Sequence, residues 1–524
     1  MQHEEHALAV ARHLSRLALS LSAEPDHRHI LEEVVDSAME LLHCDAGTLY
    51  IFRDDKLHFS VLRTQSLGIR DNAPSLDPIT LFKPNGEPSD LVVAHAFVDR
   101  TTINIPDLSQ ETRFDFSGTF AFDRQFGYNS RSFLCVPLMD HEQQVIGVLQ
   151  LINAIDDQEN VCAFNQEQQL LLEALGSLAA TVLTQRQLID TQRALFESFI
   201  RVIAEGIDYK SPVTGRHCQQ VPEIAMMLAE GVNQAGNGTY ANTRFSAEEM
   251  YELKIAAWLH DCGKITTPEA IIDKGTKLET QFDRIELVAS RIREYQQSLL
   301  IDCLTHSPDD SEALDSCRSR IAEMDLEMEF LRTTNRGSEF TSPEAVARIE
   351  QLATISWTGL DGRQRTLLSE NEVRNLSISR GTLLPEELQL MRDHIRVTDR
   401  MLNSLVYPKS LSHVPEIAVN HHEHLDGTGY PRGLSADGLS VRARIMCIAD
   451  IFEALTSPDR PYKEGMKLSQ ALTIIGRKVE DNQIDGELFT IFVRQGIYKR
   501  YAELFMAESQ IDEPDLDKLP GLMH

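Results

Sequence analysis

Two short runs of the sequence combine the side chains that proteins use to bind metal ions. The run 260–264 reads His-Asp-Cys-Gly-Lys, and the run 421–431 begins with two histidines and continues through a turn punctuated by glycines. Imidazole nitrogens and carboxylate oxygens suit paired first-row divalent ions, and such ions activate water for attack on phosphate esters. Metal-assisted hydrolysis is therefore the first hypothesis for this chain.

Each run directly follows an apolar segment that we expect to be helical. The segments are 255–259, before His260, and 417–420, before His421. Gly263 and its neighbours are expected to cap the first helix. Adjacent helical positions point about 100° apart, so two consecutive histidines can reach one cluster only from a last turn. We therefore expect a site that is assembled at helix ends.

A further candidate ligand follows the second run. Gly427 and Gly429 permit a sharp exit from the histidine pair, and Asp450 then ends the apolar segment 445–449. A carboxylate at the edge of a buried helix is costly unless it is paired or coordinated. Asp450 therefore joins the candidate metal ligands.

The composition limits the class of protein. A chain of 524 residues is too long to fold around a single hydrophobic core, so two or three domains are expected. The sequence has no apolar run of membrane-spanning length and no signal-peptide pattern, so we expect a cytoplasmic protein without membrane insertion. Eight cysteines without a CxxC pair predict reduced core thiols. A formal charge of −30 argues against a nucleic-acid polymer as partner, because a polyanion needs a broad basic surface.

The periodicity of apolar residues divides the chain into five parts. Residues 1–25 have the spacing of an amphipathic helix, whereas 26–185 combine a helix with short apolar strands, as in an α+β sensor domain. The clearest strands are expected at 48–52, 133–138 and 145–151. The remaining parts are a linker helix at 186–208, a largely helical metal-binding part at 209–496 and a C-terminal tail at 497–524.

The linker helix continues an apolar stripe that begins upstream of it. Large apolar residues recur at three- and four-residue steps from Leu171 to Ile203, interrupted by Gln185 and Gln192. A stripe between two domains favours a parallel coiled coil in a homodimer, although a core helix gives the same pattern.

Two similar segments mark the ends of an insertion in the helical part. Residues 274–279 (Lys-Gly-Thr-Lys-Leu-Glu) resemble residues 380–385 (Arg-Gly-Thr-Leu-Leu-Pro), and we interpret about 276–381 as inserted material. Apolar stripes at 282–299 and 314–331 predict two helices paired as a hairpin. The sequence does not define the role of this insertion, and a structural or partner-docking arm is the default interpretation.

The segments 131–138 and 145–153, followed by Phe164, resemble the closing half of a GAF domain. The resemblance implies a sensor domain over about 160 residues. Members that bind cyclic nucleotides carry an Asn-Lys pair, a Phe and an Asp-Glu pair here, whereas this chain has Asn153-Ala154, Phe164 and Gln168-Gln169. A GAF domain used for dimerisation and packing is therefore an alternative to a ligand-binding one, and any ligand stays open.

Residues of about 200–275 and 380–496 resemble an HD-GYP domain, a bacterial branch of the HD phosphohydrolase superfamily. The matching positions are His217, His260, Asp261, Gly263, Lys264, His394, His421, His422, the segment 426–431, Asp450 and the segment 460–463. The resemblance implies an all-α domain that hydrolyses cyclic di-GMP, a bacterial second messenger, to linear pGpG and often on to GMP. It also implies two or three metal ions, commonly iron or manganese.

The resemblance assigns a role to each matching residue. Asp261 would bridge two ions, and Lys264 would stabilise charge on the phosphate or protonate the leaving 3′ oxygen. One ion would be held by His217, His260 and Asp450, and the other by His394, His421 and His422. The substrate would be contacted by Arg460, Lys463, Gly429, Tyr430 and Pro431. The insertion leaves two candidate helices for His394, but the first has Val288 at the matching offset.

Two positions depart from the pattern of some members of this family. Val213 stands where certain members have a glutamate that supports a third metal, which favours two metals over three. Pro458 lengthens the segment between Asp450 and Arg460 by one residue relative to the shortest spacing, which affects the placement of Arg460.

These observations predict a GAF-regulated, metal-dependent cyclic di-GMP phosphodiesterase for signal transduction. One alternative is a non-catalytic scaffold that binds cyclic di-GMP, or the GGDEF cyclases that make it, through the Tyr430 loop and the insertion. Another alternative is an HD hydrolase of a different cyclic nucleotide. The sequence leaves the metal identity and the end product open.

Overall fold

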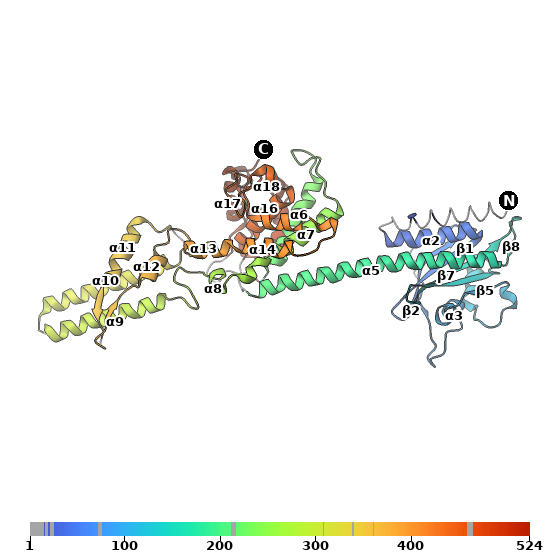
Figure 1. Ribbon diagram of the computed structural model, residues 1–524, viewed down its shortest axis with the longest axis horizontal. Coiled ribbons are helices and arrows are strands. Elements are labelled where there is room, and N and C mark those ends of the chain that lie inside the picture. The colour runs from blue at the N-terminus through green and yellow to red at the C-terminus, as the bar shows by residue number, and fades with distance from the viewer. Residues whose placement is uncertain are drawn as a thin grey trace. The chain divides into compact units, whose positions relative to one another are not determined.

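The computed structural model describes residues 15, 19–20, 26–71, 76–210, 216–307, 309–337, 340–359, 361–457 and 465–523. The chain divides into two compact units, Met1–Leu195 and Phe196–His524. The division falls inside one long helix, α5 (Gln166–Lys210) (Figure 1). The amphipathic helix expected over 1–25 lies almost entirely outside the described residues. None of the described helices is both long and apolar enough to cross a lipid bilayer.

The N-terminal unit is built on one antiparallel sheet. Its strands are β1 (Cys44–Arg53), β2 (Lys56–Thr64), β3 (Ile69–Asp71), β4 (Ile79–Thr80), β5 (Ile103–Ile105), β6 (Phe133–Met139), β7 (Val145–Ile155) and β8 (Val161–Cys162). The main order is β3-β2-β1-β7-β6-β5, with β4 paired to β2 and β8 to β7. The three expected strands fall inside β1, β6 and β7, which are adjacent in the sheet. The predicted α+β sensor fold is confirmed.

Helices cover both faces of this sheet (Figure 1). On one face, α2 (His27–Leu42) and the first part of α5 bury leucine and valine side chains against β1, β6 and β7. On the other face, α3 (Val92–Asp99) packs against a cluster that contains Tyr50 and Phe133. The central strands are apolar on both faces because both faces are covered.

Helix α5 belongs to both units, and its apolar stripe changes partners along its length. Leu172, Leu175 and Leu183 are buried against the sheet, so the start of the expected coiled-coil stripe instead packs inside the N-terminal unit. The last turns bury Ile200 and Ile207 in the core of the C-terminal unit. Between and beside them, large apolar side chains are exposed, namely Leu188, Ile189, Leu195, Phe199, Val202 and Ile203.

The C-terminal unit is a helical domain with a single main core. Its helices are α6 (His217–Gln234), α7 (Ala247–Leu259), α14 (His394–Asn403), α15 (Val414–Val419), α16 (Val441–Thr456), α17 (Leu468–Glu480), α18 (Gly486–Arg494) and α19 (Ile497–Phe505). Their apolar faces meet in one cluster that includes Ile255, Ile445 and Phe489. The same core buries Tyr498 and Tyr501 of α19, within the segment that the sequence suggested as a tail.

The insertion forms a second core beside the main one. The expected hairpin is present as α9 (Ile285–His306) and α10 (Ser311–Asn335), which pack through Val288, Ile292 and Met328. The sequence did not anticipate α11 (Pro343–Ala353), the paired strands β9 (Ser356–Thr358) and β10 (Gln364–Thr366), or α12 (Glu370–Leu376). Helix α13 (Pro385–Arg392) then leads back to the main domain.

A buried lysine closes the base of the insertion. Lys277 is 0% exposed, and its ammonium donates to Thr341 Oγ1 at 2.6 Å and to the carbonyls of Leu376 at 3.0 Å and Ile378 at 2.7 Å. Three hydrogen bonds satisfy the three ammonium hydrogens. Burial lowers the pKa of Lys277 to about 8 because the charged form loses hydration.

Candidate metal centre

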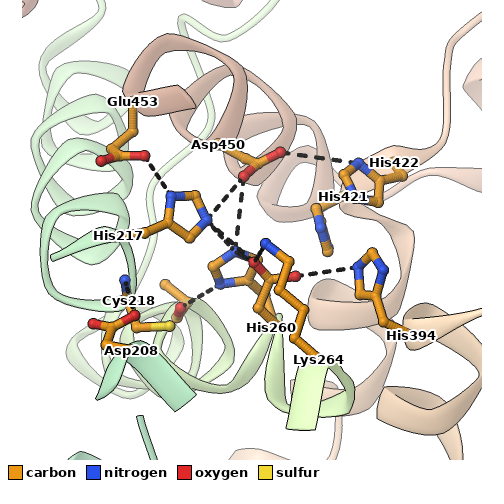
Figure 2. Close-up of polar contacts among 12 residues, drawn as sticks. Asp208, His217, Cys218, His260, Lys264, His394, His421, His422, Asp450 and Glu453 are labelled. Carbon is orange, nitrogen blue, oxygen red and sulfur yellow. Dashed lines mark hydrogen bonds and ion pairs between the residues drawn. The ribbon is translucent and has the colours of Figure 1, made fainter. Parts of the chain in front are cut away.

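The structure brings the seven expected metal ligands into one cluster. Figure 2 labels the five histidines and Asp450 of this cluster. The seven ligands come from helix ends and one helix interior: His217 begins α6, His260 and Asp261 follow α7, His394 begins α14, His421 and His422 lie in the short helix η5 (Asn420–His422), and Asp450 lies within α16. Asp450 is thus inside its helix rather than at its edge. Assembly at helix ends is otherwise as expected.

Asp261 lies between two groups of histidines. Its Oδ1 atom is 3.2 Å from His394 Nε2, and its Oδ2 atom is 3.2 Å from both His217 Nε2 and His260 Nε2. The side chain is almost completely buried. A carboxylate with one oxygen toward each group has the geometry needed to bridge two cations.

Asp450 makes a second set of contacts on the other side of the cluster. Its Oδ1 atom is 3.3 Å from His217 Nε2, and its Oδ2 atom is 3.9 Å from His422 Nδ1. Three groups have ligand atoms that lie within 4.8 Å of one another: His394, His421 and His422; His217, His260 and Asp261; and His260, His421 and Asp450.

The hydrogen bonds of the histidines leave lone pairs directed into the cluster. His260 Nδ1 contacts the carbonyl of Ala257 at 2.8 Å, and His421 Nδ1 contacts that of Ala418 at 2.6 Å. A carbonyl only accepts, so each Nδ1 carries the hydrogen and each Nε2 is a lone-pair donor. His394 is oriented in the same way by the carbonyl of Met391.

These inward-facing atoms have no adequate partner within the protein. Nε2 of His394, Nε2 of His421 and Oδ1 of Asp261 are buried without a hydrogen bond, and His217 Nε2 lies only 3.2 Å from His260 Nε2. Buried polar atoms in this state are costly unless a ligand satisfies them. Divalent cations would do so, and the backbone carbonyls behind the rings are the outer contacts typical of metal-binding histidines. The residues present therefore fit a metal centre.

The electrostatics at Asp261 and His421 favour the protonation states that can bind metal. Burial raises the pKa of Asp261, but the charges of Lys264 and His260 and hydrogen bonds outweigh it and hold this pKa well below its usual value. Burial, together with the charge of His260, lowers the pKa of His421 to about 4. At neutral pH, Asp261 is thus ionised and His421 is neutral, as metal binding requires.

Glu453 is a functional candidate that the sequence did not reveal. It lies one turn after Asp450 on α16, is almost fully buried, and its Oε2 atom contacts His217 Nδ1 (Figure 2). Burial lowers the pKa of His217, but the charge of Glu453 and hydrogen bonds to the two aspartates raise it well above its usual value. A carboxylate behind a ligating histidine fixes the ring and strengthens its outer nitrogen as a ligand.

Lys264 places its ammonium on Asp261 Oδ2. It lies in η3 (Cys262–Thr266) together with Gly263, which was expected to cap α7. The helix instead has His260 at its C-cap. A Cβ atom on Gly263 would lie 1.9 Å from the carbonyl oxygen of His394, so glycine is needed there for close approach of α14.

The loop 426–431 closes one side of the cluster. The ring of Tyr430 lies 4.8 Å from that of His422, and the guanidinium of Arg392 lies 5.2 Å from the Tyr430 ring. Gly429 is crowded, because an added Cβ would lie 2.4 Å from His424 N. Pro431 follows Tyr430, and Glu423 accepts hydrogen bonds from the backbone just beyond it.

A cavity of about 910 Å³ opens onto the cluster. His217, Lys264, His422, Tyr430 and Asp450 are among the residues that line it. The expected substrate clamp, Arg460 and Lys463, lies outside the described residues, as do Val213 and Pro458. The roles assigned to these four positions therefore stay predictions.

The last turn of α5 holds two segments of the cluster. Asp208 accepts a hydrogen bond at 3.3 Å from the backbone nitrogen of Cys218, the residue after His217. Lys210 donates to the carbonyl of Thr267 at 2.7 Å and to that of Ile265, just after the His260 run. The linker helix therefore ends in direct contact with both segments.

Family models match both units of the chain. A model described as a GAF domain matches residues 26–183, and two models described as HD domains match 214–333 and 370–488. The chain is thus a GAF and HD domain protein. The chain is similar to proteins named as cyclic di-GMP phosphodiesterases, which confirms the resemblance to the HD-GYP branch.

Three relatives illustrate this similarity. A 3′3′-cGAMP-specific phosphodiesterase of Vibrio cholerae is 43% identical over 96 residues, 18% of this chain and 22% of the relative. A cyclic di-GMP phosphodiesterase of Pseudomonas aeruginosa is 39% identical over 120 residues, 22% of this chain and 28% of the relative. A cyclic di-GMP phosphodiesterase of Thermotoga maritima is 36% identical over 144 residues, which are 28% of this chain and 37% of the relative. The chain thus matches much less than two thirds of the length of each.

Proposed function

We propose that this chain is a metal-dependent phosphodiesterase that hydrolyses cyclic di-GMP to linear pGpG, and then to GMP, under the control of its GAF domain. The observation that carries the proposal is the set of buried, unsatisfied ligand atoms that converge beside a large cavity. The names of the relatives from Pseudomonas aeruginosa and Thermotoga maritima support cyclic di-GMP as substrate.

The geometry supports a division of ligands between two cations. Asp261 would bridge the two ions, because its oxygens face different histidines. His217, His260 and Asp450 would hold one ion. His394, His421 and His422, whose ligand atoms lie close together, would hold the other. Nitrogen and carboxylate ligands suit iron or manganese, and Val213 in place of glutamate favours two ions over three.

The chain's own residues then have separate tasks. Divalent ions in such a site activate water and offset phosphate charge. Glu453 fixes the ring of His217 through its Nδ1 atom, and Lys264 keeps an ammonium beside Asp261 at the cavity wall. That ammonium is placed to stabilise charge on the phosphate or to protonate the leaving 3′ oxygen. Tyr430 shapes the pocket next to His422, and Gly429 and Pro431 hold the loop that presents it.

A product assay tests the proposal. Purified protein is loaded with Mn²⁺ or Fe²⁺ and incubated with cyclic di-GMP, and the products are separated by chromatography. We expect pGpG and GMP from the wild-type protein, none from Asp261→Ala, and normal turnover from Asp437→Ala, which changes an exposed carboxylate in the same unit. Tight binding without turnover in the metal-loaded protein would favour the scaffold alternative.

A second candidate substrate is favoured by one comparison. The relative with 43% identity is named for 3′3′-cGAMP, which shares the two-phosphate ring of cyclic di-GMP but differs in one base. Measuring kcat/KM for both dinucleotides with the same preparation decides between them. A higher value for 3′3′-cGAMP would replace cyclic di-GMP as the proposed substrate.

We also propose that the chain acts as a cytoplasmic homodimer through α5. Leu188, Leu195 and Val202 are exposed at heptad spacing, and Phe199 is exposed beside them. Two such stripes would bury each other in a parallel coiled coil. Sedimentation of the wild-type chain and of Leu195→Glu tests this, with a shift toward monomer expected for the variant. The Tyr430 loop and the insertion are the surfaces offered to GGDEF proteins, which a pull-down with a purified cyclase would test.

A further inference from the structure

The eight cysteines differ in their exposure and in their neighbours. Five are buried in the cores of the two units, as the sequence predicted for core thiols, whereas Cys162, Cys303 and Cys317 are partly exposed. Cys303 lies near the end of α9 and Cys317 near the start of α10, the two helices of the hairpin. Their thiols are in hydrogen-bonding contact. Two accessible thiols in contact can be joined by a disulfide bond.

The packing of the hairpin places these two positions opposite each other. Gln296 of α9 donates at 2.9 Å to both the carbonyl of Ile321 and the carboxylate of Asp325 on α10, so it faces a point between them. The two helices run in opposite directions, and two helical turns are about seven residues. Two turns forward from Gln296 lead to Cys303, and two turns back from the point that it faces lead to Cys317. Both cysteines therefore lie on the faces along which the helices meet.

Facing positions on packed helices satisfy the geometry of a disulfide. Helix axes pack about 8–10 Å apart and each Cα atom lies about 2.3 Å from its axis, so facing Cα atoms approach to about 4–6 Å. A disulfide needs Cα atoms about 4.4–6.8 Å apart. The bond between Cys303 and Cys317 can therefore form without a large backbone movement.

The outer half of the hairpin, residues 293–323, carries no fully buried side chain among the described residues. On α9 the buried side chains end at Ile292, and on α10 they begin at Met324. Within the outer half, Leu300, Ile301 and Leu304 are exposed. Helices that bury little apolar area open locally at low cost. A covalent link near the tip would hold this outer half closed.

We propose that Cys303 and Cys317 form a reversible disulfide that fixes the outer half of the hairpin under oxidising conditions. The oxidant is a small disulfide such as oxidised glutathione. One protein thiolate attacks it and releases one glutathione thiol; the second protein thiol then attacks the mixed disulfide and releases the other. The two cysteines are thereby oxidised and lose their hydrogens, and one glutathione disulfide is reduced to two thiols.

The two thiols differ in the step that each performs. Desolvation, and then the charge and hydrogen bond of Cys303, raise the pKa of Cys317. A raised pKa lowers the fraction of reactive thiolate at neutral pH. The first attack is therefore assigned to Cys303, and Cys317, which touches it, makes the second.

Glutathione mixtures of graded redox ratio test the proposal. The full-length protein is equilibrated in them, alkylated and cleaved after glutamate, since Glu312 separates the two cysteines. Mass spectrometry should find peptides linked through Cys303 and Cys317. The folded protein should be half oxidised at a level of oxidised glutathione at least about tenfold lower than the same chain in denaturant, because the fold holds the thiols together. Cys162→Ser, which removes the third partly exposed thiol, should behave as the wild-type protein.

Hydrogen exchange measures the effect on the hairpin. Oxidation should slow amide exchange in 296–306 and 311–321 about 10- to 100-fold, because the closed loop limits local opening. Exchange in the inner half of α9 should change little, as should exchange throughout a Cys303→Ser protein treated in the same way. The proposal is refuted by any of four results: no linked peptide, a bond that joins two chains, equal midpoints in folded and denatured protein, or unchanged exchange in the outer half.

Discussion

Two buried polar clusters in the C-terminal unit differ in whether the protein satisfies them. At the base of the insertion, the Lys277 ammonium has three acceptors within 3.0 Å and needs nothing from outside. In the ligand cluster, His394, His421 and Asp261 each leave a buried atom without a hydrogen bond. A satisfied cluster stabilises a fold, whereas an unsatisfied one stores free energy that a bound ligand can release.

The largest effect should come from removing metal. With a chelator, the inward lone pairs lose their cations, so unfolding of the main domain should become easier by about 4 kcal/mol for ions near a thousandfold above their Kd. Denaturation of a Trp357→Phe protein, in which Trp258 of α7 is the remaining tryptophan, measures this. The same treatment of a Trp258→Phe protein should leave the insertion core around Trp357 much less affected. Equal chelator effects on both reporters would contradict the comparison.

The satisfied cluster should respond to mutation rather than to metal. Lys277→Met would leave three buried acceptors without a donor, so we expect the free energy of unfolding to fall by about 3 kcal/mol. Denaturation followed at Trp357 measures the loss, with Lys409→Met, which changes an exposed lysine of the main domain, as a surface control. Metal content per folded chain should not change. A stability equal to that of the wild-type chain would show that this cluster is not structural.

Glu453 tests whether residues behind the proposed ligands also matter for metal binding. It contacts His217 in the unsatisfied cluster but is not itself a proposed ligand. Glu453→Gln keeps the shape but removes the charge behind His217, so metal affinity should fall about 10- to 100-fold. Metal titration measures the change. Glu508→Gln, an exposed change in the same unit, serves as control. Unaltered metal affinity would limit Glu453 to packing.

The smallest effect is a pH dependence that arises from Lys277. Its pKa falls from 10.5 in the unfolded chain to about 8 in the folded one. Between these pH values the unfolded chain binds more protons, so folded stability should rise with pH. Compared with Lys277→Met, the wild-type insertion should gain about 1–3 kcal/mol from pH 8 to 10.5. A flat difference across this window would mean that the lysine keeps its proton.

The sequence predicted those ligands whose chemistry is visible in consecutive residues. His260-Asp261 and His421-His422 stand out by type alone, and they lie within one cluster in the structure. Asp450 was found because it interrupts an apolar helix, although it lies inside that helix. Glu453 was missed, since one glutamate on a helix is ordinary, and only its spacing of three residues after Asp450 could have revealed it.

Other features depend on contacts between distant segments that no local pattern encodes. The contribution of the insertion to the cavity wall is visible only in the structure. The sheet order in the N-terminal unit and the small elements between α10 and α12 were equally out of reach, because pairing partners are set by packing. Gly263 was expected to cap a helix. In the structure, glycine is needed there because the backbone of His394, from a distant segment, packs against this position.

The end of α5 bears on how little movement a signal would need. Asp208 and Lys210, two residues apart, hold the backbone next to His217 and the backbone after Asp261. A helix advances about 1.5 Å per residue, while metal–ligand distances tolerate only about 0.2 Å. A displacement of α5 by a small fraction of one residue is therefore enough to change the distances between the proposed metal ligands. Control of this site would then require neither unfolding nor a large rotation of domains.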